Sequence, residues 1–320
     1  MVSNSRMTAA VELVPAWVRG EPANRLMVIL RAPGCAYDQR RAGGCTYCGF
    51  RKLTTNGAAV SPDDLTAQVD GALLKHDGAS QRIFEIDVYN SGSFLNDSEV
   101  PAEARTRIFH RISNEPSVRV VVVESRPEYV TRERLRPLVN AGAFALEVGI
   151  GIECVDDVIR EKQLRKGFTR RAFEHSVRTL KNVGAELLAY VMIKPMPMSD
   201  QDALREAVRS AEYIHEVASR LGVRARIALE PTFVVPGTPL AGEFEAGHYS
   251  PPPLALVMET ARQIAPFGDL QVGLWGEELD PLAVPEECPD SHGRLVERLR
   301  QFNQTQDPAF LDLRDCGGYL

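Results

Sequence analysis

The segment RLMVILRAPGCAYDQRRAGGCTYCGF, Arg25–Phe50, gives the strongest indication of the fold. Its apolar run Leu26–Arg31 is typical of a buried strand, and a glycine-rich loop with three cysteines follows directly. Cys35, Cys45 and Cys48 are spaced as C-x9-C-x2-C. In α/β barrels the loops at the carboxyl ends of the strands carry the chemistry, so this arrangement favours a barrel.

Apolar runs alternate with helical patterns along the rest of the chain. The expected strands are Leu26–Arg31, Arg82–Tyr89, Val118–Glu124, Phe144–Ile150, Leu187–Ile193 and Ala225–Glu230. The expected helices are Ser61–Lys75, Pro101–Ser113, Thr131–Ala141, Thr169–Val183, Ser199–Leu221 and Pro253–Ile264. Such alternation implies parallel strands joined by right-handed crossovers. The sequence therefore predicts an α/β fold, a partial (β/α)6 barrel of the TIM type, with a doubly wound sheet as the alternative.

Both ends of the chain are expected to lie outside this barrel. We assign residues 1–25 to an N-terminal appendage, residues 26–275 to the barrel and residues 276–320 to a C-terminal extension. A further strand, Leu270–Trp275, ends the barrel, and a helix, Ser291–Asn303, lies in the extension.

Composition limits the possible functions. With 44% hydrophobic residues, the 320-residue chain can bury a large core. Its net charge of −6 argues against a domain that holds nucleic acid by itself, because phosphate binding needs clustered Lys and Arg. A small-molecule or nucleoside substrate fits better, with nucleic acid only if a partner supplies the basic surface. We expect no membrane association and a cytoplasmic location, because no apolar run reaches roughly 18 residues and no signal peptide is evident.

The three clustered cysteines predict a metal centre. Thiolates are soft ligands that suit iron–sulfur clusters or zinc, and six cysteines are too few for a disulfide scaffold. Three ligands leave one iron of a [4Fe–4S] cluster open, and the amino and carboxylate groups of S-adenosylmethionine can chelate an open iron. The alternative is a structural zinc site completed by a distant residue, in a scaffold without catalysis.

The cysteine loop and several predicted strand ends together resemble the radical SAM enzymes of the Elp3-like group, including the radical SAM subunits of archaeosine synthases. The matching segments are GGCTYCGF (43–50), NSGSFLND (90–97), ESRPE (124–128), EVGIGIE (147–153), RKGFT (165–169), KP (194–195) and EPTFVVPGT (230–238). The resemblance runs from about Arg31 to about Pro253. It departs at Glu230, where the group has asparagine.

The resemblance implies a [4Fe–4S] cluster held by Cys35, Cys45 and Cys48, with S-adenosylmethionine as the second cofactor. It assigns to S-adenosylmethionine Tyr47, Ser91, Gly92, Ser93, Glu124, Ser125, Arg126, Glu147, Gly149, Glu153 and Lys166. It assigns to the substrate Asn90, Lys194, Glu230 and Thr232. From the residues alone, Ser91–Ser93 can be an ordinary turn, Glu124 can form a surface ion pair, and Lys194 can extend to the rim.

The implied activity is reductive cleavage of S-adenosylmethionine, after which the 5′-deoxyadenosyl radical abstracts hydrogen from the substrate. The first hypothesis is C–N bond cleavage in a lysine adduct of a deazaguanine base, which releases an amidine. A free nucleoside or a specialised-metabolite intermediate is the alternative substrate. An electron donor such as flavodoxin or ferredoxin is implied as a partner.

The remaining cysteines give weaker patterns. Cys288, His292 and Cys316 can form a zinc site with Asp290, or they are free thiols and a surface imidazole. Cys154 is expected to be a small buried side chain.

Overall fold

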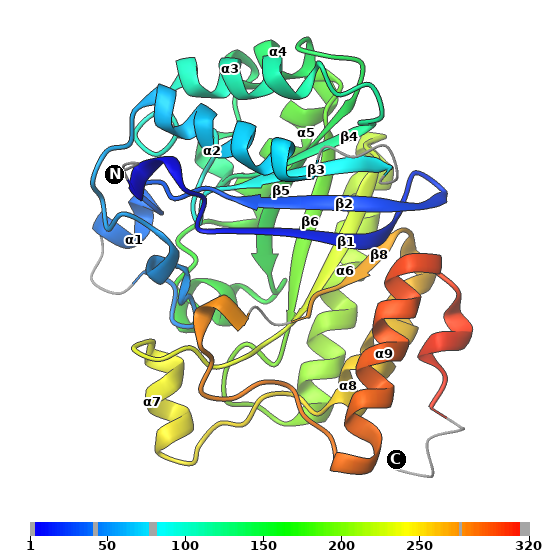
Figure 1. Cartoon of the computed structure of the whole chain (residues 1–320). Helices are drawn as coiled ribbons and strands as arrows, with labels where there is room; N and C mark the ends of the chain where they lie inside the picture. Colours follow the sequence, from blue (N-terminus) through cyan, green and yellow to red (C-terminus); the bar gives the residue numbers. More distant parts are fainter. Residues whose placement is uncertain (1–3, 41–43, 77–81, 275–276, 314–320) are drawn as a thin grey trace.

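The computed structural model describes residues 4–40, 44–76, 82–274 and 277–313 (Figure 1). Its strands are β1 Ala10–Val18, β2 Glu21–Ile29, β3 Ile83–Tyr89, β4 Val120–Glu124, β5 Ala145–Glu153, β6 Glu186–Ile193, β7 Ala225–Pro231 and β8 Leu270–Val272. They form one sheet in sequential order, in which β1 and β2 are antiparallel and the later neighbours are parallel. The sheet curls into a partial barrel, which confirms the predicted fold class and excludes the doubly wound order.

The helices are α1 Ala36–Arg40, α2 Pro62–Lys75, α3 Ala102–Ile112, α4 Arg132–Val139, α5 Arg170–Val183, α6 Asp200–Leu221, α7 Pro239–Glu245, α8 Leu254–Ile264 and α9 Pro289–Thr305. Those that connect consecutive parallel strands, α2–α6 and α8, cover the outer side of the curled sheet (Figure 1). The six helices expected between the strands are found within two residues of their predicted bounds. Ser61, Thr131, Thr169 and Ser199 each cap one of them by accepting a hydrogen bond from a backbone N–H in its first turn. None of the described helices is long and apolar enough to cross a membrane.

The N-terminal hairpin differs from the prediction. No strand is expected before Leu26, but Ala10–Val18 form β1, and β2 already begins at Glu21. Arg19 and Gly20, with φ of 55° and 89°, make the two-residue turn that matches the twist of the paired strands. Part of the predicted appendage therefore belongs to the sheet. Helix α7 is also unexpected, and Trp275 of the last predicted strand lies outside the described residues.

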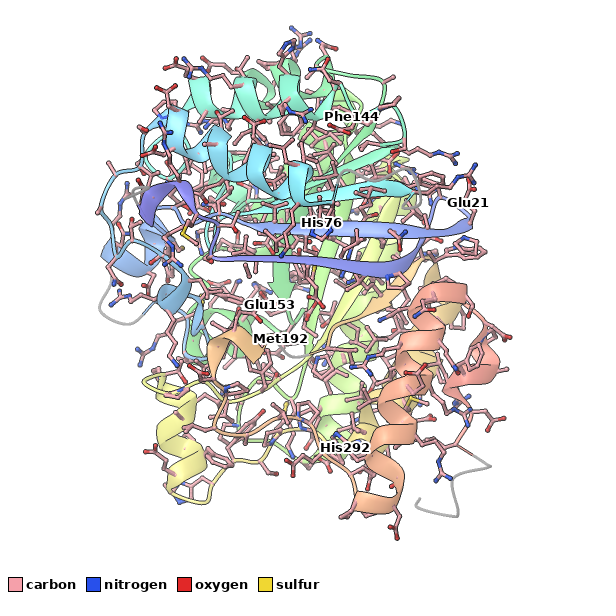
Figure 2. The ribbon with its side chains drawn as sticks, viewed as in Figure 1. Glu21, His76, Phe144, Glu153, Met192 and His292 are labelled. Carbon is pink, nitrogen blue, oxygen red and sulfur yellow. The ribbon has the colours of Figure 1, made fainter. Side chains whose placement is uncertain are left out.

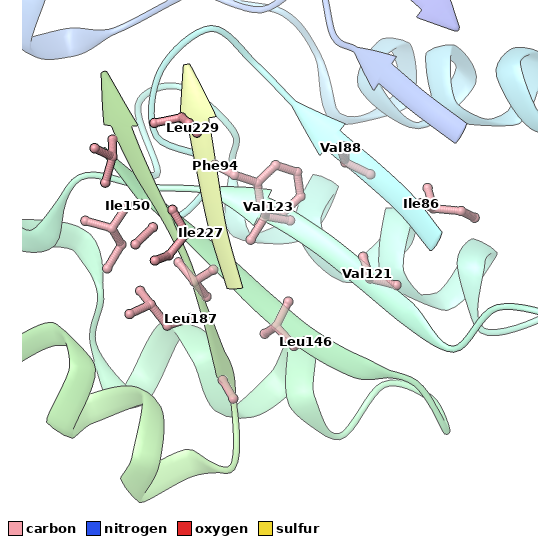
Figure 3. Close-up of a cluster of buried hydrophobic side chains, with 14 of the residues drawn as sticks. Ile86, Val88, Phe94, Val121, Val123, Leu146, Ile150, Leu187, Ile227 and Leu229 are labelled. Atoms are coloured by element: carbon pink, nitrogen blue, oxygen red, sulfur yellow. The ribbon is translucent and has the colours of Figure 1, made fainter. Parts of the chain in front are cut away.

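Alternating residues of the strands face two different environments. On β4, Val121 and Val123 face the helices and join the main core, which is shown in Figure 3. Val120 and Val122 face the inside of the barrel. The residues in phase with this second set carry most of the polar groups of the sheet, so the inner face is where a site can form.

Helix α9 covers the open side of the barrel. In the described part of the chain β8 does not pair with β1, and α9 packs against β1, β2 and β8. The Asn303 side chain donates to the Val272 carbonyl and accepts from the Val272 N–H, both at 2.8 Å. Gln306 does the same at Leu270, at 2.7 and 3.1 Å. These amides satisfy the free edge of β8.

The aromatic core under α3 makes a prediction about stability. The Phe109 ring is fully buried, with its centroid 6.0 Å from that of Phe94 and 5.9 Å from that of Phe144. Phe109→Ala leaves a cavity and should lower the free energy of unfolding by about 3–5 kcal/mol. Leu74→Ala, at a side chain that is 67% exposed, should lower it by less than about 0.5 kcal/mol. Chemical denaturation measures both values, and equal losses would contradict this assignment of the core.

Candidate functional site

A cavity of about 900 Å³ lies on the inner face of the sheet. Cys35, Cys45 and Cys48 line it from the loop at the carboxyl end of β2. Glu153 of β5 and Met192 of β6, both labelled in Figure 2, line it from the sheet. The structure therefore brings the three predicted metal ligands to the same cavity as most of the other predicted site residues.

The cysteine loop is docked by close backbone contacts. A Cβ on Gly49 would lie 2.3 Å from the Val235 side chain, so the chain after Cys48 passes where only glycine fits. The Thr46 N–H donates to the Leu164 carbonyl at 3.2 Å, and the Thr46 carbonyl accepts from the Leu240 N–H at 3.0 Å. The loop is thus held between the segment after β5 and the start of α7.

The donor set of this loop fits an iron–sulfur cluster. Burial raises the pKa of the Cys35, Cys45 and Cys48 thiols, to about 12 for Cys48. Among the described residues, no three His, Cys, Asp or Glu side chains lie close enough to hold a metal ion as they stand. Three soft thiols that open on one cavity remain the ligand set expected for a cluster with one open iron.

Glu99 joins the cysteine loop to the turn after β3. It is 1% exposed, and its Oε1 accepts from the Ala36 N–H and from the Asn96 side-chain amide, both at 2.9 Å. Its Oε2 accepts from the Asn90 amide at 3.0 Å and from the Ser93 N–H. Sequence analysis missed Glu99, because nothing in a polar loop marks one carboxylate as buried.

The turn after β3 presents polar atoms beside Cys35. A Cβ on Gly92 would lie 2.9 Å from the Cys35 backbone and 2.1 Å from Glu99 Oε2, so only glycine fits there. Ser91 Oγ and Asn90 Oδ1 are buried and have no hydrogen-bond partner within the described residues. Such atoms are costly unless a ligand satisfies them, so the turn fits a cofactor with an amino group.

A cluster of Lys166, Glu153 and Tyr47 forms another part of the cavity wall. Lys166 Nζ lies 2.8 Å from Glu153 Oε1 and 3.2 Å from the Tyr47 hydroxyl, which itself donates to Glu153 at 2.9 Å. A Cβ on Gly151 would lie 2.2 Å from Glu153 Oε1 and 3.1 Å from Lys166 Nζ, so this glycine makes room for the pair. The cluster places a cation in the cavity near Cys45.

Arg126 contacts both the turn after β3 and the segment that carries Lys166. Its N–H donates to Ser93 Oγ at 3.2 Å, and its guanidinium donates to the Lys166 carbonyl at 2.8 Å and stacks 4.0 Å above the Tyr37 ring. Arg126 donates to Glu128 at 2.6 Å, so it does not form the surface ion pair that was the alternative role of Glu124. Ser125, also predicted, is buried and lines the cavity.

Glu124 lies in the cavity beside a tyrosine pair. A Cβ on Gly149 would lie 2.9 Å from the Tyr190 ring and 3.3 Å from Glu124, so both side chains cross above this glycine. Burial raises the pKa of Glu124 to about 7, although a hydrogen bond with Tyr190 opposes the shift. Tyr190 also donates to the Tyr89 hydroxyl at 3.4 Å.

Three predicted residues have other surroundings. Glu147 lies near the amino end of β5, where Arg226 donates to it at 2.9 Å, away from the cysteines. Lys194 donates to Asp200 at 2.7 Å and does not line the cavity. Thr232 lines the cavity, but its hydroxyl donates to the Ile193 carbonyl at 2.7 Å.

Glu230 lies across the cavity at the end of β7. Burial raises its pKa to about 7, and the charges of Glu153 and Glu124 add to this shift while that of Arg25 opposes it. A Cβ on Gly273 would lie 2.0 Å from Glu230 Oε2, so the carboxylate rests against the backbone after β8.

Cys154 and Cys288 do not line this cavity. Cys154 is buried, as expected. Cys288 is exposed, and its Sγ lies 2.8 Å from Ser291 Oγ. The predicted zinc pattern also needs Cys316, which lies outside the described residues.

Comparisons with known proteins place this geometry in a family. No family model matches the chain. It is 31% identical over 305 residues to archaeosine synthase subunit beta of Methanosarcina acetivorans, covering 93% of this chain and 84% of that protein. It is 24% identical to archaeosine synthase subunit beta of Thermococcus kodakarensis, covering 92% and 89%. The solved structure of Methanocaldococcus infernus Elp3 has the same fold, with a TM-score of 0.53 at 13% identity over 77% of this chain and 60% of that one.

The family is identified by 31% sequence identity over 93% of the chain, together with the three cysteines that open on the barrel cavity. Its enzymes use a [4Fe–4S] cluster and S-adenosylmethionine. The chain belongs to the radical SAM enzymes, in the Elp3-like group that includes the beta subunits of archaeosine synthase.

Proposed function

We propose that the chain binds a [4Fe–4S] cluster through Cys35, Cys45 and Cys48 and acts by radical chemistry on a substrate in the adjoining cavity. The observation that carries this proposal is that the three thiols open on the same cavity as Ser91, whose buried Oγ has no hydrogen-bond partner within the described residues. When bound, the cluster and S-adenosylmethionine supply a carbon radical that removes a hydrogen atom from the substrate.

The chain's own residues bind and orient the cofactor. The free acceptor Ser91 Oγ suits its amino group, and Lys166, held by Glu153 and Tyr47, suits its carboxylate. Asn90, assigned to the substrate from the sequence, does not line the cavity. We assign its ribose hydroxyls to Glu124. Apolar side chains on the remaining wall keep water from the reacting atoms; they are Met27, Ile29, Met192, Phe233 and Val235.

For the substrate we propose a lysine adduct of a deazaguanine base, whose C–N bond is cleaved to leave an amidine. The similarity to the beta subunits of archaeosine synthase supports this choice. These relatives are subunits of an archaeosine synthase, which supports a partner chain for this protein as well. Such a partner would supply the basic surface that nucleic acid needs. The net charge of −6 and Glu230 in the cavity favour a free nucleoside or metabolite as the second candidate.

The substrate assignment has a direct test. Reduced enzyme with S-adenosylmethionine should convert the lysine adduct into the amidine and release 5′-deoxyadenosine in proportion, as measured by mass spectrometry. The adduct is offered both as a free nucleoside and in tRNA, and the form that turns over separates the two candidates. Formation of 5′-deoxyadenosine without any change in either form would contradict the assignment.

Removal of one thiol tests the cluster. Cys45→Ala should abolish the brown colour of anaerobically purified protein and the release of 5′-deoxyadenosine under dithionite, because two thiolates do not hold the cluster. The control is Cys288→Ser, at an exposed thiol outside the cavity, which should keep both properties. Colourless wild-type protein with stoichiometric zinc would support the scaffold alternative instead.

A glycine pair tests the contact between the turn and the cysteine loop. Gly92→Ala forces a Cβ against the Cys35 backbone, so we expect lower iron content and roughly 100-fold slower cleavage of S-adenosylmethionine. Gly71→Ala, inside α2 with nothing within 4 Å of its Cβ, should raise the free energy of unfolding by about 0.5–1 kcal/mol and leave cleavage unchanged. Full activity of Gly92→Ala would show that this close approach is not required.

A further inference from the structure

The cations that line the cavity already have partners. In the described part of the chain, Arg19 pairs with Glu186, Arg25 with Asp87, Arg126 with Glu128, Lys166 with Glu153, Arg224 with Asp269, Arg226 with Glu85 and Glu147, and Arg300 with Glu297. Each positive charge is therefore neutralised at short range by a carboxylate. A carboxylate left over in the same cavity has no cation to pair with.

Glu230 is such a carboxylate. Within the described residues its side chain has no hydrogen bond and no ion pair, although it is accessible from the cavity. Arg25, the cation whose charge opposes the shift in the pKa of Glu230, pairs with Asp87 at 3.5 Å, and the other charges that act on Glu230 are those of the carboxylates Glu124 and Glu153. Burial raises the pKa of Glu230 to about 7, which reflects the cost of an uncompensated charge.

Glu230 lies on a different strand from the residues assigned to S-adenosylmethionine. It stands near the end of β7, whereas those residues lie on β4 and β5 or in the loops after β2, β3, β4 and β5. Glu124 and Glu153 are nevertheless near enough for their charges to raise the pKa of Glu230. Met192 of β6 pairs with Glu230 in the sheet. Phe233, which follows Glu230 in the chain, also lines the cavity. A hydrogen-bond acceptor with Met192 and Phe233 beside it suits an alkyl chain that ends in a cationic donor.

We propose that Glu230 binds a protonated amino or amidino group of the substrate, and so selects cationic substrates for this cavity. The proposal rests on the proposed function in one respect, that the cavity is the substrate site. A charge-assisted hydrogen bond to Glu230 supplies the missing partner and fixes the far end of the substrate relative to the cysteines.

Two amphipathic probes test the proposal on the anaerobic holoenzyme saturated with S-adenosylmethionine. n-Hexylamine and hexan-1-ol have the same alkyl chain but differ in charge. At pH 8, where Glu230 is ionised and the amine is protonated, wild type should bind the amine at least about tenfold more tightly in an NMR titration. Glu230→Gln should reduce this preference to within about twofold, and Glu230→Asp should keep part of it.

Controls separate this inference from folding and from cofactor binding. Glu245→Gln, at an exposed carboxylate on α7, should leave the preference unchanged, and all variants should keep the melting temperature and the affinity for S-adenosylmethionine of wild type. Equal binding of both probes by wild type, or a preference that survives Glu230→Gln, would overturn the proposal. A loss of affinity for S-adenosylmethionine in Glu230→Gln would also overturn it, because Glu230 would then hold the cofactor.

Conversion of the lysine adduct and the preference for the amine test the proposed function and cation selection separately. If the lysine adduct is not converted but the amine preference disappears with Glu230→Gln, cation selection stands and the substrate assignment fails. If the adduct is converted equally by wild type and Glu230→Gln, the proposed function stands and cation selection fails.

Discussion

The Glu99 carboxylate is the constraint on which the site depends. It accepts hydrogen bonds from two backbone N–H groups, one directly after Cys35 and one in the turn after β3, and from the side-chain amides of Asn90 and Asn96. One buried carboxylate thus joins the first proposed metal ligand to the turn that carries the unpartnered Ser91 Oγ. Gly92 permits this contact because any side chain there would meet Glu99 and the Cys35 backbone. This contact sets the position of the part of the cavity wall that Cys35, Ser91 and Gly92 form.

Much of the fold could be predicted from the sequence, because parallel strands buried on the outer face are short apolar runs and the helices between them carry clear caps. Strand β1 was not predicted because most of its residues are only partly buried. Its pairing also depends on a hairpin whose second strand begins with Glu21–Asn24, a stretch without large apolar residues. Pro15 is also tolerated there only because β1 is an edge strand. Helix α7 had a usable signal, since Thr238 caps it and Pro239 occupies its first position.

The site could be predicted in part, because its residues follow strand ends or alternate on the inner face. On β5, residues 147, 149, 151 and 153 all face inward, but sequence period does not give depth along the barrel. Glu153 therefore meets Lys166 near the cysteines, whereas Glu147 meets Arg226 near the amino end. Lys194 has φ of 55°, and its side chain pairs with Asp200 at the start of α6. No local sequence pattern indicated this backbone conformation or this partner. Glu99 was missed because its burial arises only from tertiary contacts.

Three thiolates are proposed to hold a cluster whose fourth iron is free to bind the cofactor. This can be tested by electron paramagnetic resonance of the anaerobically reconstituted and reduced protein, recorded with and without S-adenosylmethionine. We expect a [4Fe–4S] signal whose g values shift when S-adenosylmethionine is added, because the cofactor becomes a ligand of one iron. A spectrum without a cluster signal, or a cluster signal that S-adenosylmethionine leaves unchanged, would refute the proposed site.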